Sequence, residues 1–254
     1  MSDARGRWLV LLVIAAASIA WLAAGELPTP ARLVTVVLVA VLPALLLAQG
    51  TIRSDEIAGL PIVPAYLSSM IMIWGIGAAA VWAGLASGMP AARLGFVSID
   101  AVDGLVWTGA ITLVALAVLA AGRMLGRREA PLLERLLPRT AVERAVFVLL
   151  SLSAGAGEEL AFRSFLIPAL HAASGSRALA VVVSSLAFGM LHSYQGAVGV
   201  LRASVLGALL SAPLLATGSV YPSIAAHALY DLIAGLLLAD WLLRRGDRAD
   251  RDGS

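Results

Sequence analysis

The chain has 254 residues, of which 60% are hydrophobic and only 13% are charged. A soluble domain usually carries about twice that charged fraction, so the composition excludes an ordinary soluble enzyme. The sequence contains no cysteine, which excludes disulfide bonds, a thiol nucleophile and thiolate metal ligands.

Apolar segments of about 20 residues recur along the chain, and this length matches a helix that crosses a bilayer. We therefore predict an all-α polytopic membrane protein with about eight transmembrane helices that enclose a polar cavity. The predicted spans are 8–24, 31–49, 62–86, 101–121, 142–172, 178–194, 197–216 and 219–242. The first span resembles a signal peptide, but its apolar core is longer than the usual stretch of about 7–15 residues, so we interpret it as a retained helix.

The spans fall into two groups of four on either side of a basic connection. We predict an N-terminal membrane region at 1–125, a cytoplasmic linker at 126–141, a catalytic membrane core at 142–243 and a disordered tail at 244–254. Within the linker, the segment APLLERLLP alternates apolar and charged residues at helical spacing. This pattern fits a helix on the membrane surface or a partly buried linker helix.

Arginine placement predicts the orientation in the membrane. All 18 basic residues are arginines. Most of them lie in three segments: before the first span, in the basic connection and in the tail. Eight spans place these three segments on one side, which the positive-inside rule assigns to the cytoplasm. The use of arginine without lysine, together with the bias toward alanine, leucine, valine and glycine, is typical of bacteria with GC-rich codons. We therefore expect a bacterial cytoplasmic membrane protein with both termini in the cytoplasm.

Ionisable side chains within the predicted spans indicate a functional site, because each costs at least about 2–3 kcal/mol at the membrane centre. Away from the ends of the spans, they are Glu158, Glu159, Arg163, His192, Arg202, His227 and Asp231, while Asp240 lies near a cytoplasmic helix end. At about 1.5 Å per residue, Glu158 and His192 lie about 22 and 21 Å from the outer ends of their spans, and Asp231 lies about 18 Å from its own. His227 lies one turn above Asp231. Three helices therefore bring acid and imidazole groups to a similar depth, in the cytoplasmic half.

Helical spacing separates the roles of the two adjacent carboxylates. Glu159 and Arg163 are four residues apart and share a helix face, so we expect them to form an ion pair. Glu158 points about 100° away and is free to face a polar cavity shared with His192 and His227. The small residues AGAG before the carboxylates let helices approach closely or leave room for water. Arg202 is interpreted as a residue that snorkels to the cytoplasmic edge, with attraction of a substrate carboxylate as the alternative.

These residue types suit the hydrolysis of a peptide bond within a membrane. The reaction needs a water molecule, a base that activates it and donors that stabilise the developing oxyanion. We expect Glu158 and His192 to hold the water jointly and His227 to polarise the carbonyl oxygen. Asp231 shares a face with His227 and is expected either to orient it through the other ring nitrogen or to help bind the oxyanion, if protonated or through a water.

A metal site is an open alternative at this stage. Glu158, His192 and His227 form a set of two histidines and one glutamate, as in catalytic zinc sites. The H-E-x-x-H signature of the familiar metalloproteases is absent from the sequence. Zinc therefore stays an alternative cofactor that the sequence does not decide.

Three motifs resemble those of a known family. The segments EELAFR (158–163), FGMLH (188–192) and HALYD (227–231) resemble the E-E-x-x-x-R, F-x-x-x-H and H-x-x-x-N/D motifs of the CAAX-protease and bacteriocin-processing (CPBP) intramembrane endopeptidases. This family includes the Ras-converting CAAX endopeptidase. ARLGF at 92–96 also resembles a segment that often precedes a span in bacterial members. The motifs cover 158–231, and the N-terminal half matches only in hydropathy.

The resemblance implies about eight helices around a water-filled cavity. It implies that Glu158 and His192 activate water while His227 and the position of Asp231 form an oxyanion-binding pair. This chain has Asp where the eukaryotic members have Asn, and an ionised Asp cannot donate a hydrogen bond. The departure makes orientation of His227 the favoured role of Asp231. The expected supporting residues are Glu159, Arg163 and the packing residue Phe188. The family is often labelled metalloprotease, but that label does not decide the metal question here.

We therefore predict a CPBP-family intramembrane protease that acts on membrane-associated peptides or protein tails near the cytoplasmic interface. Its partners would be such substrates and the lipid bilayer, and we expect no nucleic acid. Bacteria generally lack prenylated CAAX proteins, so the eukaryotic substrate class is not transferred. One alternative is a non-catalytic scaffold or immunity protein of the same fold. Another is a proton-coupled transporter, which would predict inverted repeats in both halves, whereas the polar groups gather in the C-terminal half.

Overall fold

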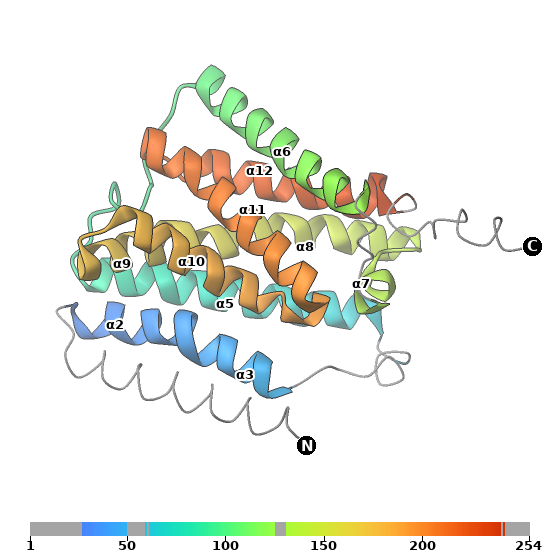
Figure 1. Ribbon diagram of the computed structural model, residues 1–254, viewed down its shortest axis with the longest axis horizontal. Helices are drawn as coiled ribbons and strands as arrows, with labels where there is room; N and C mark the ends of the chain where they lie inside the picture. The colour runs from blue at the N-terminus through green and yellow to red at the C-terminus, as the bar shows by residue number, and fades with distance from the viewer. Residues whose placement is uncertain (1–26, 50–58, 60, 125–130, 240, 242–254) are drawn as a thin grey trace, which may run out of the picture.

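Helices make up all the regular structure in the part of the chain that can be described (Figure 1). The computed structural model describes residues 27–49, 59, 61–124, 131–239 and 241. The predicted span at 8–24 and the predicted tail lie outside the described residues.

The helices of the N-terminal half are α2 (Thr29–Val36), the π-helical η1 (Val37–Val41), α3 (Leu42–Gln49), α5 (Ile62–Ala86) and α6 (Ala101–Met124). Those of the C-terminal half are α7 (Pro131–Leu136), α8 (Ala141–Glu159), the π-helical η2 (Leu160–Leu166), α9 (Ile167–Ser174), α10 (Arg177–Leu191), the 3₁₀ turn η3 (Ser193–Gln195), α11 (Gly196–Thr217), α12 (Tyr221–Leu232) and the π-helical η4 (Ile233–Leu237). α8, η2 and α9 follow one another without a break, as predicted for 142–172.

Five of the described helices are long and apolar enough to cross a membrane. They are Thr29–Leu47, Ile62–Ala86, Ala101–Met124, Ala141–Ser174 and Ser193–Thr217. The prediction of an all-α polytopic membrane protein is therefore confirmed, whereas the number of eight spans is not. α10 is apolar but has only 15 residues, and the segment of α12 and η4 is not among the five. The division into four regions and the cytoplasmic position of the termini stay predictions.

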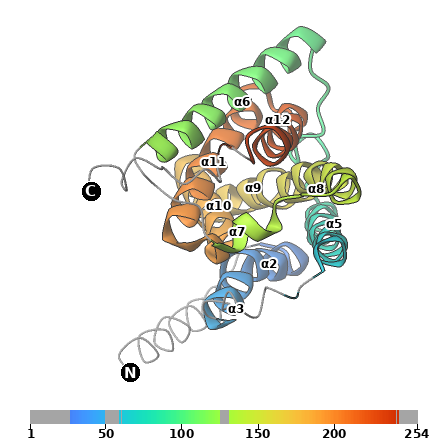
Figure 2. The same cartoon turned by 90° about the vertical axis from the view of Figure 1, so that its right-hand side faces the viewer.

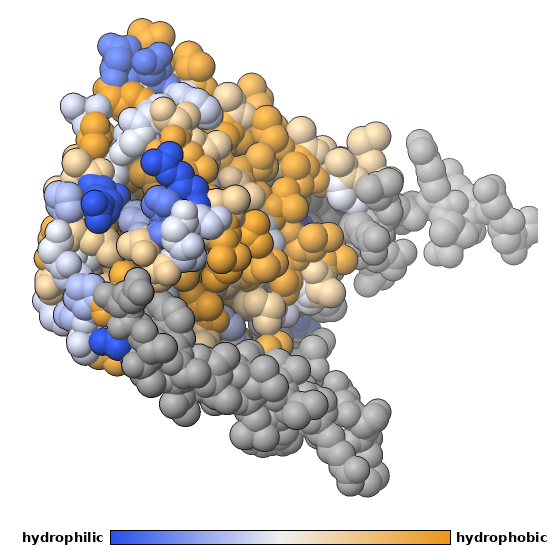
Figure 3. Space-filling view, turned by 60° about the vertical axis from the view of Figure 1, so that its left-hand side comes forward, coloured by the Kyte–Doolittle hydropathy of each residue, from blue (hydrophilic) through white to orange (hydrophobic). Residues whose placement is uncertain are grey.

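The surface has the pattern expected of a protein surrounded by lipid. Large apolar side chains such as Ile71, Leu105 and Leu113 are exposed. Figure 3 shows hydrophobic residues forming a broad area on one face, with hydrophilic residues gathered toward one end of it. An exposed apolar area of this kind marks a membrane contact in a chain with several apolar helices.

α8 is the central helix of the fold. Figures 1 and 2 show it between α5 on one side and α12 on the other, with α6 beyond α12 and α2 beyond α5. Small residues permit this packing. A Cβ atom on Gly155 would lie 2.8 Å from the Ala228 Cβ atom, and one on Gly157 would lie 2.5 Å from the Ile73 Cγ2 atom. The close helix approach expected from AGAG is confirmed, and it brings α8 against the helix that carries His227.

Both ends of the site-bearing segment are fixed by local hydrogen bonds. At the start of α8, the Thr140 hydroxyl accepts a bond from the Glu143 amide at 3.2 Å, and the Glu143 carboxylate accepts one from the Thr140 amide at 3.0 Å. This capping box satisfies amides that the first helical turn leaves unpaired. At the other end, Gly175 adopts a left-handed conformation, which ends α9 and turns the chain into α10.

The loop before α6 and the linker helix are both anchored to membrane helices. In the ARLGF segment, Leu94 is fully buried and the Gly95 carbonyl accepts a hydrogen bond from the Val220 amide at 3.0 Å. This bond ties the loop to the start of α12. At the linker, the Tyr66 hydroxyl donates to the Leu136 carbonyl at the end of α7. These contacts favour a partly buried linker helix over one that lies free on the membrane surface.

Candidate active site

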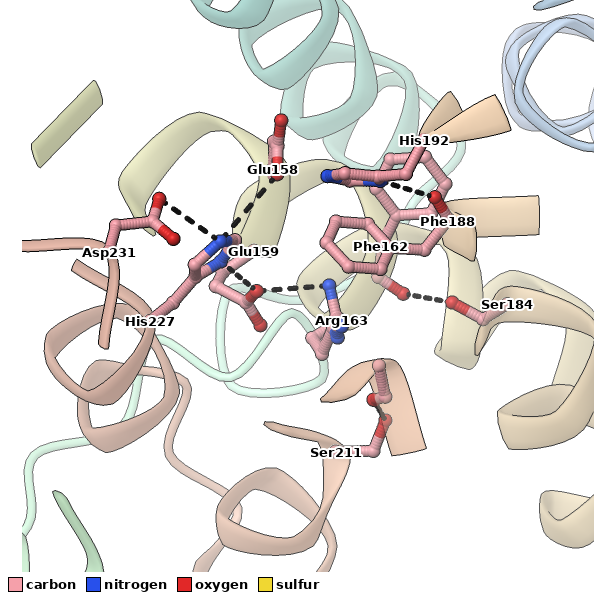
Figure 4. Close-up of polar contacts among 11 residues, drawn as sticks. Glu158, Glu159, Phe162, Arg163, Ser184, Phe188, His192, Ser211, His227 and Asp231 are labelled. Carbon is pink, nitrogen blue, oxygen red and sulfur yellow. Dashed lines mark hydrogen bonds and ion pairs between the residues drawn. The ribbon is translucent and has the colours of Figure 1, made fainter. Parts of the chain in front are cut away.

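Three helices and a π-helical turn position the polar residues predicted from the sequence (Figure 4). Glu158 and Glu159 end α8, and Arg163 follows in η2. His192 caps the C-terminus of α10, while α12 carries His227 and Asp231 on one face. π-helical turns inside α-helices occur often at functional sites, and here one begins directly after the paired carboxylates.

Glu159 and Arg163 form the predicted ion pair. The Arg163 Nη1 atom lies 2.9 Å from the Glu159 Oε1 atom, and both side chains are buried. The guanidinium also lies over the Phe188 ring, with its Cζ atom 4.4 Å from the ring centroid. A buried charge needs a partner of opposite sign, and each of these two groups supplies it for the other.

Glu159 has a second contact that sequence reasoning missed. The His227 Nδ1 atom lies 2.8 Å from the Glu159 Oε1 atom and donates a hydrogen bond to it. The expectation that Asp231 orients His227 through this nitrogen is therefore wrong. Asp231 lies beside the other ring nitrogen, with its Oδ2 atom 3.7 Å from Nε2. Spacing along α12 suggested the Asp231 contact, whereas the Glu159 contact arises from the close approach of α8 and α12.

The Nε2 atom of His227 faces two carboxylates. The Glu158 Oε2 atom lies 3.8 Å from it, on the opposite helix from Asp231. Both distances exceed a direct hydrogen bond, so the two carboxylates flank this nitrogen without bonding to it directly. The side chains of Glu158 and Asp231 are 19% and 29% exposed, in contrast to the buried Glu159. The structure thus brings Glu158, His227 and Asp231 together at a partly accessible position.

Phe188 connects His192 to the rest of the group. The Phe188 carbonyl accepts a hydrogen bond from the His192 Nδ1 atom at 3.0 Å. The centroid of the Phe188 ring lies 4.8 Å from that of His192 and 5.9 Å from that of His227. Figure 4 shows the far edge of the His192 ring turned toward the side on which Glu158 lies. Phe188 is therefore more than helix packing, because its ring contacts both imidazoles and Arg163.

Glu158, His192 and His227 do not come together as a set of metal ligands. Among the described residues, no group of three or more His, Asp or Glu side chains is arranged to hold a metal ion. The Nδ1 atoms of His192 and His227 are engaged by the Phe188 carbonyl and Glu159, so only their Nε2 atoms could face a metal ion. As they are placed in the structure, Glu158, His192 and His227 do not form a zinc site.

A polar cluster beside His192 was not predicted as part of the site. The Tyr194 ring stacks on the His192 ring, with centroids 6.0 Å apart and planes 28° apart. The Gln195 amide donates to the Tyr194 hydroxyl at 2.9 Å, and Arg202 donates to the Gln195 side-chain carbonyl at 2.9 Å. Arg202 thus extends toward the start of α11, the direction expected of a snorkelling side chain. The signal that could have found this cluster is the position of Tyr194, two residues after His192.

A comparison with known protein families matches the part of the chain that carries these residues. Residues 140–233 match the family model described as type II CAAX prenyl endopeptidase Rce1-like. No curated protein and no solved structure matches the chain. The matched segment starts at the capping residue of α8 and ends in η4, so it contains every residue of the predicted site. The match supports the resemblance to the CPBP and CAAX proteases that the three motifs indicate, over the segment that carries them.

Proposed function

We propose that the protein is an intramembrane endopeptidase that hydrolyses peptide bonds of membrane-associated peptides or of membrane-protein tails. The observation that carries the proposal is the position of His227. Its Nδ1 atom is bound by the buried Glu159, and its Nε2 atom faces the carboxylates of Glu158 and Asp231 at 3.8 and 3.7 Å. The family match supports the same class of reaction.

In this proposal Glu158 and His192 activate the attacking water. A carbonyl oxygen only accepts hydrogen bonds, so the contact with Phe188 assigns a proton to the His192 Nδ1 atom. The Nε2 atom of the neutral ring is then an acceptor. A water that donates to this atom and to the Glu158 carboxylate can attack the peptide carbonyl carbon while its proton passes to Glu158. The partial exposure of Glu158 gives water access to it.

His227 would stabilise the oxyanion that forms on the carbonyl oxygen. Its Nδ1–H group donates to Glu159, so the ring presents a second N–H group only as the imidazolium. The Glu159 carboxylate balances the positive charge of that ring. The Nε2–H group would then donate to the oxyanion. Asp231, when ionised, would act through a bridging water, because a carboxylate has no proton to donate.

The tetrahedral intermediate would collapse with help from the same carboxyl group. The proton that Glu158 has taken from the water passes to the leaving nitrogen, and the C–N bond breaks. The products are a new carboxyl terminus and a new amino terminus, and the Glu158 carboxylate is restored. No further reactant is needed to balance the reaction.

The test compares membranes that contain the wild-type protein with membranes that contain Glu158→Gln, using mass spectrometry of newly formed peptide termini. Glu143→Gln is the matched control, since Glu143 lies at the start of the same helix and glutamine also serves in a capping box. We expect termini that depend on the wild-type and Glu143→Gln proteins and are lost with Glu158→Gln. Identical termini in all three membranes would refute the proposal and favour a non-catalytic scaffold.

A further inference from the structure

The segment that follows His192 presents an accessible aromatic ring at the candidate site. Among the residues that the structure describes, His192 has two aromatic neighbours, Phe188 and Tyr194. Phe188 is 1% exposed, whereas Tyr194 is 39% exposed. A peptide whose carbonyl group is attacked by a water held at His192 must pass close to this ring. Tyr194 is therefore the aromatic neighbour of His192 that a substrate can touch.

The Tyr194 ring is held in place by a chain of hydrogen bonds. Its hydroxyl accepts a bond from the Gln195 amide at 2.9 Å, and the Gln195 side-chain carbonyl accepts one from Arg202 at 2.9 Å. Both ends of the Gln195 amide are thus engaged. A ring fixed before binding loses less conformational freedom when a ligand stacks on it, which favours binding.

A glycine makes room for this chain of bonds. A Cβ atom on Gly199 would lie 2.2 Å from the Gln195 Cβ atom and 3.2 Å from its Oε1 atom. Any larger residue at this position would displace the Gln195 side chain from the surface of α11. The lack of a side chain at Gly199 therefore leaves the space in which Gln195 connects Tyr194 to Arg202.

An ordinary interfacial tyrosine would not need these contacts. Tyrosines at a membrane boundary place the ring in the interface and the hydroxyl in water. Here the hydroxyl is bound within the protein and the ring stacks on a residue proposed to hold the attacking water. This arrangement fits a surface that receives part of the substrate.

We propose that Tyr194 is a specificity-determining residue, whose ring stacks against a large apolar or aromatic side chain of the peptide substrate next to the cleaved bond. This inference rests on the proposed peptidase function. Aromatic contacts of this kind contribute about 0.5–1.5 kcal/mol beyond the area they bury. Tyr194 would therefore favour such a side chain over alanine by about twofold to twelvefold.

The test incubates the purified full-length protein in detergent with a library of peptides cut from a proteome, and identifies the cleaved bonds by mass spectrometry. The quantity measured is the enrichment of large apolar and aromatic residues over alanine at each position beside the cleaved bond. We compare the wild type with Tyr194→Ala, Tyr194→Phe and Tyr221→Ala. Tyr221 is the matched control, because it is a tyrosine of similar exposure, 48%, at the start of α12.

We expect one flanking position at which Tyr194→Ala lowers the enrichment about twofold to twelvefold. Tyr194→Phe keeps the ring but loses the bond to Gln195, so it should lower the enrichment by less than Tyr194→Ala. Tyr221→Ala should keep the wild-type enrichment. Unchanged enrichment in Tyr194→Ala, or an equal loss of kcat/KM for peptides with an aromatic residue and with alanine, would overturn the inference and leave the peptidase function standing. If Tyr194→Ala does not fold, Gln195→Leu removes only the tether, and it must lower the same enrichment for the inference to hold.

The same assay separates failure of the inference from failure of the function. Glu158→Gln should cleave no peptide in the library. A library left intact by the wild type as well would refute the peptidase function, and the proposed role of Tyr194 would fall with it.

Discussion

At the scale of single residues, the role of Glu159 is the main departure from the sequence-based prediction. Its pairing with Arg163 follows from a spacing of four residues within one helix and is confirmed at 2.9 Å. Its bond to His227 joins residues 68 positions apart, and helical periodicity contains no information about such a contact. Helical periodicity instead predicted Asp231 as the partner of His227, because the two residues lie four positions apart on one helix.

Replacing Glu159 with glutamine tests its role as a positioning residue. Glu159→Gln keeps the size of the side chain but removes the charge that balances the His227 imidazolium and Arg163. If the imidazolium binds the oxyanion, we expect kcat to fall about tenfold to a hundredfold while KM changes little. Steady-state kinetics on a peptide found by the library assay would show this. A rise in KM with unchanged kcat would contradict the assignment.

A second prediction distinguishes two roles of Asp231, which are hydrogen bonding to the oxyanion and supplying a negative charge. An asparagine at this position can donate a hydrogen bond directly to the oxyanion, whereas an ionised aspartate needs a bridging water. We expect Asp231→Asn to keep kcat within about threefold of the wild type and Asp231→Ala to lose about a hundredfold. Equal losses in the two variants, measured under the same conditions, would show that the carboxylate charge itself is required.

At the scale of elements, the prediction depended on apolar periodicity and on small residues. The predicted span 62–86 coincides with α5, and the predicted end at 121 falls short of the end of α6 at Met124. The π-helical turn η2 was not predicted, because the apolar pattern of Leu160–Leu166 also suits an α-helix. Tertiary packing decides between these two forms, and the sequence pattern does not show it.

The close packing of α8 against α12 predicts a specific effect of a glycine replacement. A Cβ atom on Gly155 would lie 2.8 Å from the Ile224 carbonyl oxygen, a backbone atom that cannot rotate away. Gly155→Ala should therefore push α12 from α8, lower the free energy of unfolding by about 1–3 kcal/mol and loosen the bond between Glu159 and His227. Thermal unfolding in detergent and the cleavage assay would measure both effects.

The control for this replacement is Gly75→Ala. No atom lies within 4 Å of the position that a Cβ would occupy on Gly75 in α5, so this variant adds a methyl group to a membrane helix without a clash. It should keep the wild-type stability and activity. If Gly155→Ala and Gly75→Ala behave alike, the contact between α8 and α12 does not control the site.

At the scale of the whole molecule, hydropathy predicted the fold class but not the number of spans. Five described helices meet the length and apolarity of a span, and α10 stops at 15 residues. The predicted span 178–194 extends past the end of α10 at Leu191, because hydropathy does not detect where a helix ends within an apolar segment. For α8, α10 and α12, the sequence predicted only that their polar residues lie at a similar depth in the membrane. The contacts between these residues could be described only from the structure.

The proposed mechanism requires that Glu158 faces water within the membrane-embedded protein. Since the chain has no cysteine, Glu158→Cys and Leu152→Cys each introduce a single thiol on α8. Leu152 is 50% exposed and lies on a surface assigned to lipid, whereas Glu158 is 19% exposed. Thiols react as thiolates, which form in water and not in lipid.

The most direct test is therefore the labelling of these two variants, in membranes, by a charged and water-soluble thiol reagent. We expect the thiol at position 158 to be labelled and the thiol at position 152 to stay unlabelled, despite the larger exposed fraction of Leu152. Labelling at 152 with none at 158 would place position 158 away from water and rule out Glu158 as the base that activates it.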